Sequence, residues 1–309
     1  MRHKKSVVVI NPGILSDLLI ANEQFSKRHK ILYINLSNKS LTEFDHELKK
    51  CDQIIIDDLD STDFNDNDIS LINYYRVVES KSINVSEVFE KYHKRVPVIK
   101  ILGKWSGPKE LLNIKISKHI EFSKRITDTF LIITLLPIII FFIFIGVVLI
   151  KLTSKGPIFF KQERVGKNGR PFSLYKLRTM VHSEEGHISH TIVNDERIYP
   201  IGKFLRFSKI DELPQCVNVL LGQMSIIGPR PERTEIVKKL DLENPYYELR
   251  HLIRPGITGW AQINNPTATP NQNFEKLEYD LYYIKNANFY LEILIIIKTI
   301  RIIFERNSL

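Results

Sequence analysis

The sequence predicts an α/β N-terminal domain with a small parallel sheet, followed by a mainly α (α+β) domain associated with a membrane. Three features lead to this prediction: short β-branched runs early in the chain, a long uncharged apolar segment near its middle, and a later region dense in Gly, Pro, Arg and paired acids. The composition, 43% hydrophobic and 26% charged, can build hydrophobic cores and excludes a wholly disordered chain.

The first sixty residues contain three short apolar runs separated by polar stretches compatible with helices. This alternation is typical of parallel strands joined by helices. Farther along, residues 83–102 predict a helix followed by a final strand. The three runs are Val7–Ile10, Ile31–Leu36 and Gln53–Asp57.

A dinucleotide site would require a glycine-rich turn after the first strand. The turn here, Asn11-Pro12-Gly13, has a single glycine, so the sequence argues against such a site. Gly103, Gly107 and Pro108 mark a linker. We therefore divide the chain into a Rossmann-like accessory domain, residues 1–112, and a membrane-associated domain, residues 113–309.

The basic excess belongs to the second domain. The formal net charge is +9; residues 1–110 carry 17 Lys/Arg against 16 Asp/Glu, which leaves 27 against 19 for the remainder. A basic face attracts nucleic acid, anionic lipid or a phosphorylated substrate, and we expect no nucleic acid because no nucleic-acid motif is present. Cys51 and Cys216 lack the spacing of a zinc site, and neither a disulfide framework nor a cleaved export signal is expected.

Residues Thr129–Ile150 form a segment of 22 residues without a charge. A hydrocarbon core about 30 Å thick needs roughly 20 such residues as helix, so this segment is expected in lipid. Lys and Arg flank it on both sides, whereas a spanning helix usually has its basic excess on one side. Pro137 would bend the helix. On these residues alone, a spanning helix and a re-entrant helix that breaks at Pro137 remain equal alternatives.

Residues 289–305 combine Ile, Leu and Phe with four charged residues spaced close to one helical face. Such a helix could pack on the core or lie in the lipid interface, and we favour the interface.

The sequence Asp211-Glu212-Leu213-Pro214 is the strongest candidate for chemistry. Its simplest interpretation is a helix start, because Asp caps well and Pro fits early helix positions. An ionised carboxylate there could also act as a nucleophile, and a neighbouring carboxylate could hold Mg²⁺ together with phosphate oxygens. Asp211 and Glu212 are therefore candidates for both catalysis and metal binding.

Phosphate requires positive partners, and three arginines adjoin Pro/Gly-stiffened turns or the acidic pair. Arg206 precedes Asp211 by five residues, Arg230 lies in GPRP, and Arg254 opens RPGITG. These turns are expected to leave backbone amides free for an anion, although ordinary tight turns remain an alternative. The histidines in VHSEEGHISH fit no standard zinc spacing, so a metal site there is not expected.

From about Lys124 to Ile303 the chain resembles the bacterial sugar transferases, which are monotopic polyprenyl-phosphate phosphoglycosyl transferases. The resemblance rests on many motifs in order: KRxxD from Lys124, GPxFFxQxRxGxxGxxF from Gly156, KxRTM from Lys176, NDxRI from Asn194, IGxFLR, DELPQxxNVLxGxMSxIGPRP, RPGITGWAQxN, and DxxYIKN from Asp280.

The resemblance implies transfer of a sugar 1-phosphate from a UDP-sugar to undecaprenyl phosphate with release of UMP, as a first step of surface polysaccharide synthesis. It makes Asp211 the nucleophile that forms a phospho-sugar intermediate and Glu212 its Mg²⁺-associated partner. Arg206 is implied to bind substrate phosphate, and with it we assign to substrate binding the basic residues Arg164, Lys176, Arg178, Arg230 and Arg254.

The same resemblance implies a re-entrant helix at about 124–150, broken at Pro137, with both ends on the cytoplasmic face of the bacterial inner membrane. The N-terminal part is similar to the α/β domain of longer members, which carry four membrane helices before it, so the chain resembles a trimmed long form. A structural or dimerising role is expected for residues 1–110. The alternative function is a membrane-bound scaffold that recruits glycan-assembly partners through this domain.

Overall fold

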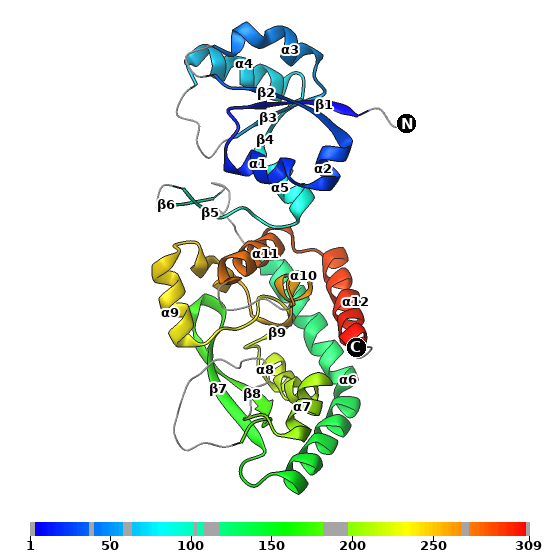
Figure 1. Cartoon of the computed structure of the whole chain (residues 1–309). Helices are drawn as coiled ribbons and strands as arrows, with labels where there is room; N and C mark the ends of the chain where they lie inside the picture. Colours follow the sequence, from blue (N-terminus) through cyan, green and yellow to red (C-terminus); the bar gives the residue numbers. More distant parts are fainter. Residues whose placement is uncertain are drawn as a thin grey trace. The chain divides into compact units, whose positions relative to one another are not determined.

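The computed structural model describes residues 4–36, 40–57, 64–101, 104–107, 118–181, 197–266 and 272–306. The chain forms two compact units, residues 1–114 and 115–309, which we call the N-terminal and C-terminal units (Figure 1). Each unit has its own hydrophobic core.

The N-terminal unit is built on a four-stranded parallel sheet with the order β2-β1-β3-β4. This confirms the predicted parallel sheet, and the three apolar runs supply its first three strands. β4 has a single apolar residue and so left no signal in the sequence. The strands are β1 (Lys5–Ile10), β2 (His29–Ile34), β3 (Gln53–Ile56) and β4 (Ser82–Asn84).

Helices cover both faces of this sheet (Figure 1). Because side chains alternate along a strand, Val7 and Val9 pack with α1 and α5, while Val8 and Ile10 pack with α3 and α4. The predicted final strand, β5 (Ile99–Ile101), forms an antiparallel pair with β6 (Lys104–Ser106) and does not join the sheet. The helices are α1 (Ile14–Ile20), α2 (Glu23–Arg28), η1 (Leu41–Phe44), α3 (Asp45–Lys50), α4 (Asp66–Val77) and α5 (Val85–His93).

At the turn after β1, a carboxylate from another part of the chain lies where dinucleotide-binding folds place a phosphate. Buried Asp57, which follows β3, accepts hydrogen bonds from the amides of Gly13 (3.1 Å) and Ser16 (3.3 Å) and from the Ser16 hydroxyl (2.9 Å). These amides open α1, the position that a pyrophosphate takes in such folds. A bound phosphate would compete with Asp57 and meet its negative charge, which agrees with the weak glycine signature.

In the C-terminal unit, α6 (Lys118–Thr153) is a single helix of 36 residues that contains Pro137. The family resemblance implied a break at Pro137, but helical structure continues through this residue. A proline removes one backbone hydrogen bond, which a helix can absorb by bending, and α6 changes direction partway along (Figure 1). Within the described residues, the segment Glu121–Thr153 is the one helix long and apolar enough to cross a membrane.

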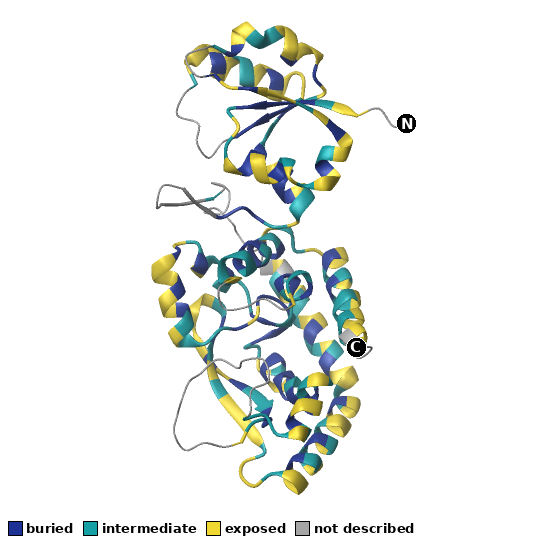
Figure 2. Cartoon of the chain, in the orientation of Figure 1, coloured by how far each residue is buried: buried dark blue, intermediate teal, exposed yellow. Residues whose placement is uncertain are grey.

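Much of α6 is exposed and only a narrow stripe of it is buried (Figure 2). The exposed side chains include the large apolar residues Phe130, Phe141 and Phe144. A soluble helix would normally expose polar residues on its outer side, so the surface of α6 suits contact with lipid. The stripe repeats at helical spacings of four and seven and consists of Asp128, Ile132, Ile139, Gly146 and Ile150.

The rest of this unit is mostly helical, as predicted, around an antiparallel hairpin (β7–β8) and a short parallel pair (β9–β10). Its elements are β7 (Phe159–Val165), η3 (Lys167–Gly169), β8 (Pro171–Leu177), α7 (Pro200–Phe207), η4 (Ile210–Glu212), α8 (Gln215–Leu220), β9 (Ser225–Ile227), α9 (Thr234–Glu243), η5 (Tyr247–Leu252), β10 (Gly256–Thr258), α10 (Trp260–Asn264), α11 (Asn273–Asn286) and α12 (Phe289–Arg306).

The last helix, α12, packs one side on the core through Leu291 and Ile295 and exposes Phe289 and Phe304. Glu292 is not on an outer charged face: it accepts hydrogen bonds from Lys124 (2.6 Å) and Tyr283 (3.0 Å) and so ties α12 to α6 and α11. Core packing and an apolar outer surface thus coexist in this helix.

Candidate active site

The acidic pair Asp211–Glu212 lies in η4, a single 3-10 turn between α7 and α8. Lys209 precedes it in the left-handed region (φ 60°), a conformation that non-glycine residues rarely adopt, and so turns the chain sharply after α7. Neither acid caps a helix: Lys209 occupies the N-cap position of η4, Pro214 that of α8, and neither cap makes a side-chain hydrogen bond. The motif does begin helical structure, with both acids in the first turn of η4 and Pro214 directly before α8, but the predicted capping role of Asp is wrong.

The apolar helix α6 directly supports this turn. Ile210 packs with Ile150, Leu177 and Leu205 in one buried cluster. Gly146 of α6 is in close contact, since a Cβ there would lie 2.5 Å from Leu177 Cδ1 and 3.3 Å from Ile210 Cγ2. The residue before the acidic pair is thus fixed by the apolar helix α6.

Glu212 is held between two cations. One of its oxygens, Oε1, accepts hydrogen bonds from Lys176 Nζ and Arg230 Nη2, both at 2.8 Å. Burial alone would raise the pKa of Glu212, but the attraction of Arg230, Lys176 and Lys209 outweighs it and holds this pKa well below its ordinary value. Glu212 therefore stays ionised and keeps both cations beside η4.

Asp211 is in the opposite electrostatic situation. It is 5% exposed, and its Oδ1 is buried without a hydrogen-bond partner in the described part of the chain. Burial and repulsion from Glu212 raise the pKa of Asp211 to about 6, although Lys176, Lys209 and Arg206 work against the rise. At pH 7 this carboxylate is mostly ionised but poorly solvated, and its unpartnered Oδ1 leaves an oxygen able to attack an electrophile or bind a cation.

Arg206 reaches the acidic pair from α7. Its Nε donates to Thr179 Oγ1 at 2.8 Å, and its charge lowers the pKa of Asp211. α7 lies directly against the chain after β8, because a Cβ on Gly202 would come 2.1 Å from the Thr179 carbonyl oxygen. Glycine at position 202 thus permits the approach that brings Arg206 beside Asp211.

The remaining predicted substrate ligands are engaged in structural contacts. Arg164 donates to Pro231 O (3.0 Å) and Gln162 Oε1 (2.7 Å), and Arg178 is 5% exposed and binds Ser154 and the Lys155 carbonyl. Arg254 Nε donates to Gly222 O at 3.0 Å, beyond the C-terminal end of α8. Of the eight predicted site residues, the structure brings together Lys176, Arg206, Asp211, Glu212 and Arg230, and uses Arg164, Arg178 and Arg254 to hold loops and a helix end.

The GPRP and RPGITG turns also differ from expectation. Gly228 N donates to Thr258 O (2.9 Å) and Gly256 N donates to Pro229 O (2.8 Å), so these amides join the two turns to each other. A Cβ on Gly256 would lie 2.1 Å from Gly228 N, which explains why glycine occupies both positions. The two glycine amides are therefore not free for an anion, and the contribution of this region to the site is the side chain of Arg230.

Residues 119–306, about three fifths of the chain, match the family model described as bacterial sugar transferase. The chain belongs to the bacterial sugar transferase family. This confirms the family resemblance seen in the sequence, and the acidic pair with its cations lies inside the matched region.

Relatives of this sugar transferase include enzymes named for polyprenyl-phosphate chemistry. It is 45% identical over 184 residues to UDP-N-acetylgalactosamine-undecaprenyl-phosphate N-acetylgalactosaminephosphotransferase of Aeromonas hydrophila (59% of this chain, 44% of the relative). It is 41% identical over 165 residues to UDP-glucose:undecaprenyl-phosphate glucose-1-phosphate transferase of Xanthomonas campestris pv. campestris (52% and 34%). An uncharacterized sugar transferase of Bacillus subtilis is 38% identical over 178 residues (58% and 85%). The chain thus spans less than half the length of the first two.

Two buried residues of the sugar transferase that the sequence did not single out hold its cations in place. Arg250 Nη2 donates to both Asp280 Oδ2 and the backbone carbonyl of Arg230, at 2.9 Å each. Fully buried Asn218 of α8 accepts from Tyr175 N (3.2 Å) and donates to Ser173 O (2.7 Å), which fixes the strand that carries Lys176. Asn218, and Asp280 as the partner of Arg250, both lie in motifs of the family resemblance, but their structural roles become visible only in the fold.

The donor set of the site suits a magnesium ion. Mg²⁺ prefers oxygen ligands and commonly takes one or two carboxylates, with water and substrate phosphate completing its shell. Asp211 has a buried Oδ1 without a partner in the described structure, and Glu212 presents a second carboxylate beside it. The described residues contain no cluster of three or more His, Cys, Asp or Glu able to hold a metal by themselves. The histidine-rich segment of residues 182–190 lies outside the described residues.

Proposed function

We propose that this sugar transferase moves a sugar 1-phosphate from a UDP-sugar to undecaprenyl phosphate, releasing UMP, through a covalent intermediate on Asp211. The observation that carries the proposal is the pair of adjacent carboxylates with opposite pKa shifts, raised at Asp211 and lowered at Glu212, beside three cations. The names of the relatives support the same donor and acceptor classes.

In the first step, a carboxylate oxygen of Asp211 attacks the β-phosphorus of the UDP-sugar. The bond between this phosphorus and the bridging oxygen breaks, and UMP leaves with the electron pair. Glu212 binds Arg230 and Lys176 and so holds both cations beside Asp211, its partner in the acidic pair, which we call the dyad. The two cations can therefore stabilise the charge that develops on the phosphoryl oxygens without rearranging. A Mg²⁺ ion held by Asp211 and Glu212 would neutralise further phosphate charge.

In the second step, a phosphate oxygen of undecaprenyl phosphate attacks the same phosphorus, and Asp211 leaves as a carboxylate. A hollow of about 290 Å³ suits this acceptor, because Arg206 and Lys209 line it together with Phe207, Ile302 and Ile303. The same two cations lower the pKa of Asp211 by their charge, which relates the hollow to the acidic pair. Arg206 and Lys209 would bind the phosphate of the acceptor, and the apolar side chains would contact its first prenyl units.

The acceptor lipid requires the dyad to lie at a membrane surface, and the packing of α6 supports a re-entrant, monotopic placement. Near its start, Arg125 donates to the Leu220 carbonyl at 2.6 Å and Lys124 binds Glu292. Near its end, Gly146 and Ile150 pack around η4. Both ends of the apolar helix thus contact one compact unit, which fits entry and exit on the cytoplasmic face of the inner membrane better than a complete crossing.

The proposal is tested by incubating the purified chain with undecaprenyl phosphate, Mg²⁺ and a panel of UDP-sugars that includes UDP-N-acetylgalactosamine and UDP-glucose. Attack at phosphorus releases UMP, whereas attack at the anomeric carbon of the sugar releases UDP. We expect UMP from at least one donor. Release of UDP, or of no nucleotide from any donor, would show that the proposed function is wrong.

The pH dependence of the first step should report the titration of Asp211. Since burial raises the pKa of Asp211 to about 6, the rate of UMP release in a single turnover without acceptor should level off above pH 7. Below pH 6 it should fall about tenfold per pH unit, because protonation removes the nucleophile. Omitting the acceptor matters, because a phosphate monoester itself titrates near pH 6. A rate independent of pH between 5 and 8 would contradict this assignment.

A further inference from the structure

The N-terminal unit contains a hollow of about 620 Å³ that has no part in the proposed reaction. It opens at the edge of the sheet where the parallel strands begin, since Lys5, His29 and Gln53 are the first residues of β1, β2 and β3. The end of α2 and one side of α5 complete its walls. Its volume is within the range of pockets that hold small organic ligands.

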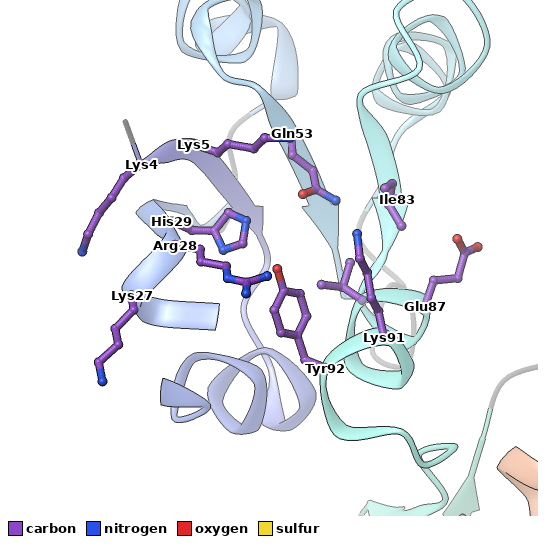
Figure 3. Close-up of a pocket in the computed structure, with 11 residues that line it drawn as sticks. Lys4, Lys5, Lys27, Arg28, His29, Gln53, Ile83, Glu87, Lys91 and Tyr92 are labelled. Atoms are coloured by element: carbon purple, nitrogen blue, oxygen red, sulfur yellow. The ribbon is translucent and has the colours of Figure 1, made fainter. Parts of the chain in front are cut away.

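The lining is strongly basic. It contains one carboxylate, that of Glu87, and five basic residues. The basic residues are Lys4, Lys5, Lys27, Arg28 and Lys91. Lys27 is already paired with Glu23, at 2.5 Å. Among the described residues, Arg28 and Lys91 make no ion pair, and Glu87 points away from the space that these two cations face (Figure 3). Two such cations facing one space attract an anion, and a guanidinium suits phosphate.

Polar and aromatic groups complete the hollow. In Figure 3 the polar ends of Arg28, Tyr92, Gln53 and Lys91 face a common space, whereas Lys27 and Glu87 point away from it. The ring of Tyr92 is fixed by edge contacts with Phe25 (5.2 Å between centroids) and with buried His29 (6.0 Å). Gln53 supplies both a donor and an acceptor, so a planar heteroaromatic ring could be recognised beside the cations.

The opposite edge of the sheet is closed to such a ligand, because Asp57 occupies the amides at the start of α1. We propose that the basic hollow binds a phosphorylated ligand of mononucleotide size, with its phosphate on Arg28 and Lys91 and its ring against Tyr92 and Gln53. This ligand site is separate from the acidic pair and does not depend on the proposed function.

Hydrogen exchange measured by mass spectrometry on the full chain in detergent tests this proposal, because it localises binding even if nucleotides also occupy the acidic site. The probes are UMP, AMP, inorganic phosphate and phosphatidylglycerol vesicles. We expect a mononucleotide to protect peptides that cover residues 23–34 and 82–93. In Arg28→Ala/Lys91→Ala, protection should require roughly 100-fold more nucleotide, because two charged hydrogen-bond donors are lost.

The matched control is Lys30→Ala/Lys50→Ala, which removes the same charge from exposed positions outside the hollow and should bind as the unmodified chain does. Protection by neither nucleotide, or equal protection in the Arg28/Lys91 variant, would overturn the proposal. Equal protection by inorganic phosphate would exclude the ring contact and so overturn the assignment of a ligand of mononucleotide size. Protection by vesicles alone would identify a lipid headgroup as the ligand and also overturn it. None of these outcomes decides whether the acidic pair releases UMP, which is tested separately.

Discussion

Asp211→Asn is expected to reduce UMP release from every UDP-sugar by roughly 10⁴-fold or more, the size of effect seen when a catalytic nucleophile is removed. Asparagine keeps the shape of the side chain but cannot form the acyl phosphate linkage. The dyad cations should stay in place, because Lys176 and Arg230 are bound to Glu212 and not to Asp211. The measurement is single-turnover release of UMP, together with a search for a labelled sugar phosphate attached to the protein.

A stability measurement separates lost chemistry from lost structure. Burial raises the folded-state pKa of Asp211 to about 6, from its ordinary value of 3.8, so its ionisation costs stability above pH 6 and costs nothing below about pH 4. Asp211→Asn should therefore raise the melting temperature at pH 7 to 8, and this gain should vanish near pH 4. Glu235→Gln, at an exposed position of α9, should change neither property. Normal turnover by Asp211→Asn would refute the covalent mechanism.

The sequence predicted the parts of the fold that depend on local pattern. The β-branched runs predicted the parallel sheet most clearly at β1 and β3, because these strands are buried and must be nearly continuously apolar. The uncharged segment predicted α6, because about 20 successive apolar residues suit a helix placed in a hydrocarbon core. β4 was missed because Ser82, Ile83 and Asn84 are held in the sheet by pairing with β3, which is a tertiary effect that three residues cannot encode locally.

The sequence could predict candidate residues that lie in motifs with a recognisable chemistry. It could not predict which of the arginines the fold would place beside the acidic pair. Asp211, Glu212, Arg230 and Lys176 meet at η4, although 35 residues separate Lys176 from Asp211 in the chain. No local pattern distinguishes Arg230, which faces Glu212, from Arg178, whose guanidinium is buried against Ser154. An arginine beside a tight turn can bind a phosphate or a backbone carbonyl, and only the fold determines which of them is near.

The second large effect should come from Arg250→Met. Arg250 is 6% exposed and forms a 2.9 Å ion pair with Asp280, which is 2% exposed. Removing one partner leaves a buried unpaired charge, and such changes typically cost about 3 to 5 kcal/mol. Burial already raises the pKa of Asp280 to about 6 against the attraction of Arg250, so without Arg250 it should rise further. The destabilisation, followed as melting temperature in detergent, should therefore be larger at pH 8 than at pH 5.

UMP release should fall as well, because Arg250 donates to the backbone carbonyl of Arg230 and so positions a cation of the site without touching substrate. The double variant Arg250→Met/Asp280→Asn distinguishes these two roles. Removing the stranded charge should recover much of the lost stability, whereas the Arg230 carbonyl still lacks its donor and the rate should stay low. If the double variant recovers both, the bond between Arg230 and Glu212 suffices to place the guanidinium, and Arg250 acts on stability alone.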